Sequence, residues 1–169
     1  MNKITIATYC CILLALSSCN DYNRVLKTQD YSYKYEVAKQ YYAEGQYNRA
    51  SLLLQDVLSV LKGTDQGEES LYLSGLCNMK AHNYSAASTV FRKYYETYPR
   101  GKYVEEARFN CGRSLYAITP EPRLDQTDTF QAVTEFQNFI ETFPGSKYRA
   151  QAQRSEERRV GKECRSRWS

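Results

Sequence analysis

The chain has 169 residues and a formal net charge of +4, but its excess of basic residues lies at the two ends. Lys3 contributes +1 and residues 154–169 contribute +3, so residues 19–153 carry no net charge. The basic composition therefore does not indicate nucleic-acid binding.

Residues 1–18 are predicted to be a cleaved signal peptide. The apolar run over residues 4–16 is shorter than the roughly 20 residues that a membrane-spanning helix needs, and it has the length of a secretory signal core. It leads into Leu-Ser-Ser-Cys19, which resembles the lipobox of bacterial lipoproteins. The resemblance implies that Cys19 is lipidated with acyl chains such as palmitate. Because Asn20 follows, and not an aspartate, the outer membrane is the expected location, facing the periplasm.

A linker, residues 19–30, precedes a repeated pattern that covers residues 31–153. Small residues recur every 37 positions, at Ala38, Gly75 and Gly112, with an aromatic residue three positions before each. Twelve positions after the first two stands an alanine, followed four positions on by a large apolar residue. This spacing is typical of tetratricopeptide (TPR) hairpins, in which small residues let two helices cross closely. The sequence therefore predicts an all-α fold, a TPR-type α-solenoid of antiparallel helix hairpins.

Turn residues divide this region into repeats. Residues 45–47 and 82–84 are predicted turns between paired helices, and residues 61–63 end the first repeat. Pro99 and Pro144, each behind an aromatic residue, end the second and third repeats.

The third repeat is longer than the others and leads into a fourth. Its eight extra residues lie within residues 118–128, and a loop can accept such an insertion because loop entropy grows slowly with length. The segment Tyr98–Tyr103 recurs as Phe143–Tyr148, which predicts the start of a truncated fourth repeat before residue 153.

Residues 154–169 show no apolar periodicity and resemble the translation of a DNA-sequencing adapter. We interpret them as an artefact; the alternative is a genuine basic tail with an acidic partner. Between Cys19 and this segment only Cys77 and Cys111 remain. They can pair in an oxidising periplasm or pack as small apolar side chains, and their helical context favours packing.

No catalytic constellation is visible. The only histidine, His82, lies in a predicted turn, and no glycine-rich phosphate loop or His-x-x-x-His motif is present. The acidic pairs Glu68-Glu69 and Glu105-Glu106 are expected to stabilise helix starts and not to act as acid and base. The sequence therefore predicts a binding scaffold with no enzymatic activity, no metal and no cofactor.

Three rows of side chains are expected on the first helices of the hairpins, which line the concave face of TPR folds. The rows are Tyr35, Tyr72 and Phe109; Tyr42, Met79 and Tyr116; and Lys39, Leu76 and Arg113. The aromatic rows have two interpretations, packing between repeats or a groove for an extended peptide. In the second, the aromatic rings hold apolar side chains and Lys39 or Arg113 meets a terminal carboxylate. Substituting Tyr72 or Arg113 by alanine is then predicted to weaken peptide binding.

Residues 16–153 resemble the BamD family. The resemblance lies in the lipobox, the TPR hairpins, the segment Asp125-Gln126-Thr127, and the two joints between repeats, Tyr98–Tyr103 and Phe143–Tyr148. The resemblance implies a lipid-anchored scaffold of the outer-membrane β-barrel assembly machinery. Its expected partners are unfolded outer-membrane proteins, a BamA-like barrel subunit and other assembly subunits. The alternatives are a SusD-like glycan-binding lipoprotein, although such proteins are much longer and usually contain several tryptophans, and a structural TPR adaptor of the cell envelope.

Overall fold

A computed structural model describes residues 22–118 and 127–157, and every regular element in these ranges is a helix. Six helices follow one another: α2 (Tyr31–Ala43), α3 (Tyr47–Val60), α4 (Asp65–Lys80), α5 (Tyr84–Thr97), α6 (Val104–Ile118) and α7 (Thr127–Thr142). Two shorter helices, residues 22–27 and 149–157, flank them. The all-α prediction is therefore confirmed. Cys19, most of the predicted insertion and residues 158–169 lie outside the described residues.

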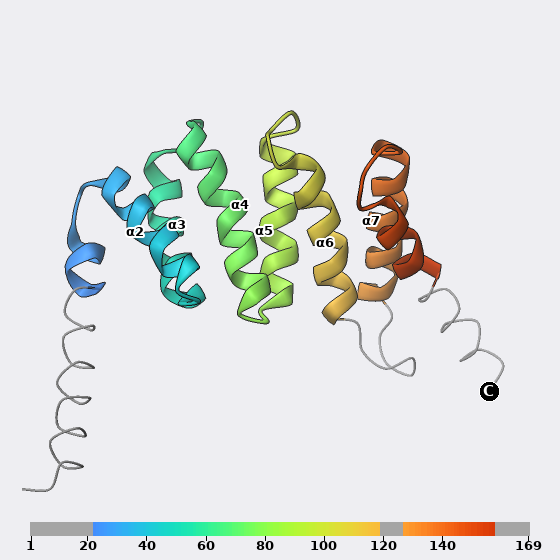
Figure 1. Cartoon of the computed structure of the whole chain (residues 1–169), viewed down its shortest axis with the longest axis horizontal. Coiled ribbons are helices and arrows are strands. Elements are labelled where there is room, and N and C mark those ends of the chain that lie inside the picture. The colour runs from blue at the N-terminus through green and yellow to red at the C-terminus, as the bar shows by residue number, and fades with distance from the viewer. Residues whose placement is uncertain (1–21, 119–126, 158–169) are drawn as a thin grey trace, which may run out of the picture.

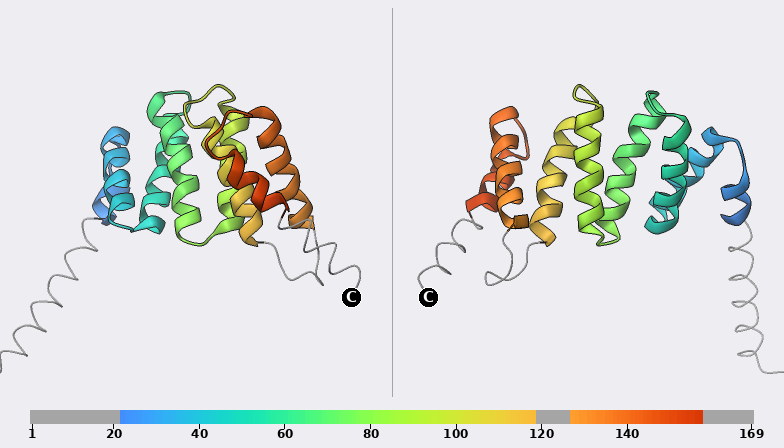
Figure 2. Two further views of the ribbon diagram at one scale, coloured as in Figure 1. Left: turned by 45° about the vertical axis from the view of Figure 1, so that its right-hand side comes forward. Right: turned by 180° about the vertical axis from the view of Figure 1, so that it is seen from behind.

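The helices form three hairpins that stack side by side into one curved layer (Figures 1 and 2). The hairpins are α2 with α3, α4 with α5, and α6 with α7, and each second helix also packs against the first helix of the next hairpin. The first helices α2, α4 and α6 also contact one another directly, which places them on the inner side of the curve. This is the arrangement that the repeat spacing predicted.

Local sequence explains where the helices begin. The Asp30 side chain accepts a hydrogen bond from the Tyr33 amide at 2.9 Å and caps α2. Thr64 caps α4 in the same way, through the Gly67 amide at 3.1 Å. Such caps satisfy backbone N–H groups that have no partner within the helix.

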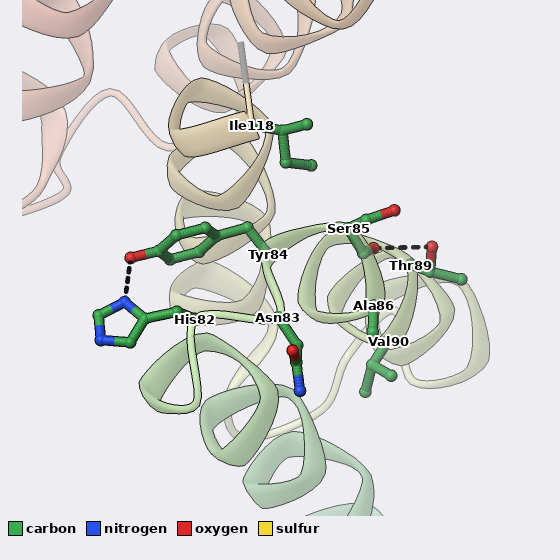
Figure 3. Close-up of a pocket in the computed structure, with 8 residues that line it drawn as sticks. All are labelled: His82, Asn83, Tyr84, Ser85, Ala86, Thr89, Val90 and Ile118. Atoms are coloured by element: carbon green, nitrogen blue, oxygen red, sulfur yellow. Dashed lines mark hydrogen bonds between the residues drawn. The ribbon is translucent and has the colours of Figure 1, made fainter. Parts of the chain in front are cut away.

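The turns inside the first two hairpins share one geometry. Gly45 has a φ of 78°, and the residue 37 positions later, His82, has a φ of 62°. In both turns three successive amides reach back to carbonyl groups of the preceding helix, for example the Asn83 amide to the Asn78 carbonyl at 2.8 Å. A histidine is unusual in this left-handed region, which favours glycine. Its ring Nδ1 lies 2.7 Å from the Tyr84 hydroxyl, as Figure 3 shows.

The small residues of the repeat lie where paired helices cross. A Cβ atom on Gly75 would come within 2.6 Å of the Phe91 ring, and one on Gly112 would come within 2.9 Å of the Phe136 ring. Both phenylalanines are fully buried. In the first hairpin the corresponding small residue is Ala38. The glycines therefore make room for the larger aromatic side chains of their own hairpins.

The joint of residues 98–103 connects the second and third hairpins, and Glu68 of α4 holds it through hydrogen bonds. The Tyr94 hydroxyl donates to Glu68 Oε1 at 2.5 Å and accepts a hydrogen bond from the Tyr103 amide at 2.9 Å. Glu68 Oε1 also accepts a hydrogen bond from the Lys102 amide at 2.7 Å. Glu68 and Glu105 do lie in the first turns of α4 and α6, as predicted. Glu68 in addition fixes the connection that follows α5.

Cys77 and Cys111 are free and fully buried. Burial raises the pKa of each thiol to about 12. Both therefore stay protonated and unreactive at neutral pH, because the thiolate is the reactive form. This confirms packing over pairing.

The helix of residues 149–157 packs as the first helix of a fourth repeat. Ala152 is fully buried in a cluster with Phe109, Phe136 and Phe139. The helix continues past residue 153, where the artefact segment was predicted to begin, and that boundary stays a prediction. No helix among the described residues is long and apolar enough to cross a membrane.

Candidate peptide-binding groove

The first predicted row of binding residues is buried. Tyr35 is 4% exposed, Tyr72 is 8% exposed and Phe109 is 2% exposed. Each lies three positions before the small residue of its helix, so it shares the face that turns into the packing between helices. Their burial favours packing between repeats, the first of the two interpretations that the sequence leaves open, over an open peptide groove.

Two of these rings each receive a tyrosine from the joint that follows. The Tyr72 and Tyr103 rings are parallel, with 4.4 Å between centroids and 1° between planes. The Phe109 and Tyr148 rings stack in the same way, at 4.6 Å and 14°. Tyr103 and Tyr148 end the two recurring joint segments that the sequence showed. These stacked pairs thus help to fix how each hairpin is positioned against the next.

Glu106, on α6, connects one side chain of α4 with two side chains of the joint that follows α7. Its carboxylate accepts hydrogen bonds from the Tyr72 hydroxyl at 2.8 Å and the Tyr148 hydroxyl at 2.9 Å, and the Lys147 ammonium lies 3.6 Å away. Burial by itself raises the pKa of Glu106, but the two hydroxyl groups and Lys147 lower it more. The resulting pKa lies below the ordinary value of 4.5. The ionised carboxylate is therefore the form that the fold stabilises.

This predicts an acid-sensitive contribution to stability at Glu106. Because the folded-state pKa is lowered, the contribution is complete above the unfolded-state value of 4.5 and is lost as the pH falls through the lowered pKa. We expect Glu106→Gln to lower the free energy of unfolding by about 1 kcal/mol at neutral pH and by less in acid. Urea unfolding at neutral pH and at a pH below 4.5 measures this. Exposed Glu96 provides the control variant Glu96→Gln, and an equal pH dependence in both variants would contradict the assignment.

Three of the predicted residues do come together at an open groove. Met79, Arg113 and Tyr116 line a groove of about 410 Å³ between α4, α6 and the helix of residues 149–157. The other lining residues are Lys80, Tyr84, Ala117, Phe136, Gln151 and Ser155. The groove thus lies on the inner helices of three successive repeats.

The groove combines an apolar floor with positive charge. Met79 and Tyr116 are half-buried and pack against the central core cluster, and Phe136 lies beneath them. Lys80 and Arg113 supply two cations, and no carboxylate belongs to the lining. The exposed Arg113 guanidinium donates one long hydrogen bond, 3.4 Å, to the Asn110 side chain. Its remaining N–H groups suit a carboxylate ligand.

The other two predicted residues lie outside this groove. Lys39 sits 4.8 Å from the centre of the Tyr35 ring and 3.9 Å from the Glu69 carboxylate. Tyr42 packs edge-on against Tyr47, with 5.7 Å between ring centroids. Both therefore belong to the first hairpin and its contact with the second.

Sequence reasoning missed Lys80, Tyr84 and Gln151. Lys80 and Tyr84 flank the turn between α4 and α5, so a pattern restricted to one helix face does not include them. Gln151 comes from the fourth repeat, and the offset of 45 residues that located this repeat was the signal that could have placed it.

The fold defines the class of protein: a helical-repeat protein of the TPR type, with a groove on its inner helices. Residues 27–157 match the family YfiO, described as outer membrane lipoprotein. The chain therefore belongs to this outer membrane lipoprotein family. A comparison with curated proteins finds no match.

Proposed function

We propose that this lipoprotein is a lipid-anchored scaffold of the outer-membrane β-barrel assembly machinery. In this role it binds unfolded outer-membrane proteins and other assembly subunits, including a BamA-like barrel subunit. Family membership supports the outer-membrane setting. The observation that carries the binding role is the groove in which Met79, Tyr116 and Arg113 meet.

The groove has the chemistry to hold the C-terminal end of an extended polypeptide. Met79 and Tyr116 offer apolar area to an aromatic side chain, and methionine adapts its shape to different partners. Arg113 and Lys80 offer cations to the terminal carboxylate. Unfolded β-barrel proteins that end in an aromatic residue have both features.

We expect Arg113→Ala to weaken binding of a fluorescent peptide with a free C-terminal phenylalanine by about tenfold, the effect of losing one charge-assisted contact. Fluorescence anisotropy measures the dissociation constant. Arg100→Ala, which removes an exposed arginine in the joint between α5 and α6, is the matched control.

Amidating the peptide removes its terminal charge and tests the same contact from the other side. Amidation should weaken binding to the wild type and have little further effect on Arg113→Ala. If the arginine variant and the amidated peptide both bind as tightly as their references, the groove is not the site. Titration with glycans tests the glycan-binding alternative, and saturable binding in the absence of peptide binding would favour it.

A further inference from the structure

The helix of residues 22–27 presents a mixed apolar and basic surface. Val25 is 6% exposed and packs into the core of the first hairpin. At 100° per residue, Lys27 and Arg24 lie about 60° apart on the side of the helix opposite Val25, and Leu26 lies at the edge of that side, beyond Asn23. Leu26 is 37% exposed, and both basic side chains are exposed.

A groove of about 540 Å³ continues this surface onto α2. Arg24, Val25 and Thr28 form one side of it, and Tyr33, Val37, Gln40 and Tyr41 form the other. Tyr33 is 51% exposed, so the hairpin leaves much of this large side chain uncovered. Tyr33 thus offers apolar area in the groove that Arg24 lines, and Leu26 offers apolar area on a neighbouring side of the same short helix.

Arg24 and Lys27 form no ion pair with a carboxylate among residues 22–118 and 127–157. The ion pairs in these ranges involve other lysine and arginine residues. Arg24 and Lys27 differ in this from the remainder of the first hairpin. Lys34 is buried against Asp56, and Lys39 lies beside Glu69. Arg24 and Lys27 are therefore available to an external anion.

The position of this surface in the chain identifies its partner. The inference rests on the proposed lipid anchor at Cys19, three residues before Tyr22. Three extended residues span at most about 11 Å, and four helical residues add about 6 Å. Leu26 therefore stays within roughly 17 Å of the anchored residue, so this surface can reach the membrane that holds the anchor.

We propose that Arg24, Leu26, Lys27 and Tyr33, the docking face, bind the anionic phospholipid surface in which the acyl chains are inserted. Leu26 and the Tyr33 ring enter the interface between headgroups and acyl chains, and Arg24 and Lys27 meet lipid phosphates. Because the anchor makes this contact intramolecular, weak individual interactions suffice. Docking holds the first hairpin against the membrane and sets the direction in which the other hairpins extend into the periplasm.

Fluorescence quenching in vesicles tests the docking face. The lipidated full chain carries Trp168→Phe, so that a single tryptophan is introduced either by Leu26→Trp or by Leu52→Trp. Leu52 is 55% exposed on α3 and provides the matched control. The vesicles contain phosphatidylethanolamine and phosphatidylglycerol with brominated acyl chains. We expect severalfold stronger quenching of the Leu26→Trp chain than of the Leu52→Trp chain.

Charge reversal then tests the role of the cations. Arg24→Glu with Lys27→Glu should weaken docking by at least about fivefold for each cation removed, and high salt should do the same. Lys62→Glu with Lys93→Glu alters the same number of exposed lysine or arginine charges elsewhere and should leave the quenching unchanged.

Vesicle flotation separates this inference from the proposed anchor. Flotation with equal quenching at the two positions would show that the anchor exists and that the docking face is wrong. Without flotation both the anchor and the docking face are wrong, because a chain that stays away from the vesicles cannot be quenched by their acyl chains. Flotation with stronger quenching at position 26 than at position 52 supports both.

Discussion

We expect Gly75→Ala to lower the free energy of unfolding by about 1–3 kcal/mol, the usual effect of overpacking a core. The added Cβ atom would lie 2.6 Å from the Phe91 ring, which is fully buried, so the ring or the helix must shift within the core. Urea denaturation followed by circular dichroism measures the loss. Gly145→Ala is the matched control, because no atom lies within 4 Å of its added Cβ and its φ is not in the left-handed region.

The first hairpin supplies a compensating substitution. At the positions of Gly75 and Phe91 it has Ala38 and Leu54, and both are fully buried in one cluster. We therefore expect Phe91→Leu to recover part of the stability that Gly75→Ala loses, because the smaller side chain makes room for the new methyl group. Phe91→Leu by itself should destabilise the chain by about 1 kcal/mol through the cavity it leaves. Strict additivity of the two losses would contradict a direct contact between these residues.

The second large effect is expected at the joint after α5. Tyr94→Phe removes the hydroxyl that joins Glu68 to the Tyr103 amide. The ring stays in place, so the loss comes from the Tyr103 amide, which is left without this partner, and from the hydrogen bond that Glu68 no longer accepts, about 1–3 kcal/mol. Thermal and urea unfolding measure it. Tyr33→Phe, which removes the hydroxyl of an exposed tyrosine, is the control and should change stability little.

The next joint shows how this loss can be reversed. There Phe139 stands where Tyr94 stands, and Ser146 replaces Gly101, at the same offset of 45 residues. The Ser146 hydroxyl donates to Glu105 Oε1 at 2.5 Å and accepts a hydrogen bond from the Tyr148 amide at 3.0 Å. It thus makes both contacts that the tyrosine hydroxyl makes in the earlier joint.

Gly101→Ser should therefore act oppositely in two backgrounds. In the wild type its Cβ atom would lie 2.6 Å from both the Tyr94 hydroxyl and Glu68 Oε1, so we expect destabilisation; Tyr94→Phe removes the first of these contacts, and the Glu68 side chain can shift to accept the new hydroxyl. In Tyr94→Phe the serine hydroxyl takes the vacated position, and we expect recovery of at least about 1 kcal/mol. A serine that destabilises both backgrounds equally would show that the two joints are not equivalent.

The candidate groove shows the limit of sequence reasoning at a functional site. Met79, Arg113 and Tyr116 were identified because they recur at fixed distances from the small residues of their helices. The same rule also selected Tyr35 and Tyr72, which are buried. A helical period tells which residues share a face, but not whether the next hairpin covers that face.

The sequence by itself determined the all-α repeat fold, its phase and its turns, because small residues, caps and turn residues act through contacts with near neighbours in the chain. Only the tertiary structure decided which aromatic residues became core. The Tyr103 and Tyr148 rings cover Tyr72 and Phe109 from 31 and 39 residues further along the chain. It likewise decided that Glu68 accepts a hydrogen bond from the Tyr94 hydroxyl on α5 and that Glu106 accepts one from the Tyr72 hydroxyl on α4. Such contacts depend on how hairpins stack, and no local spacing in the chain specifies that geometry.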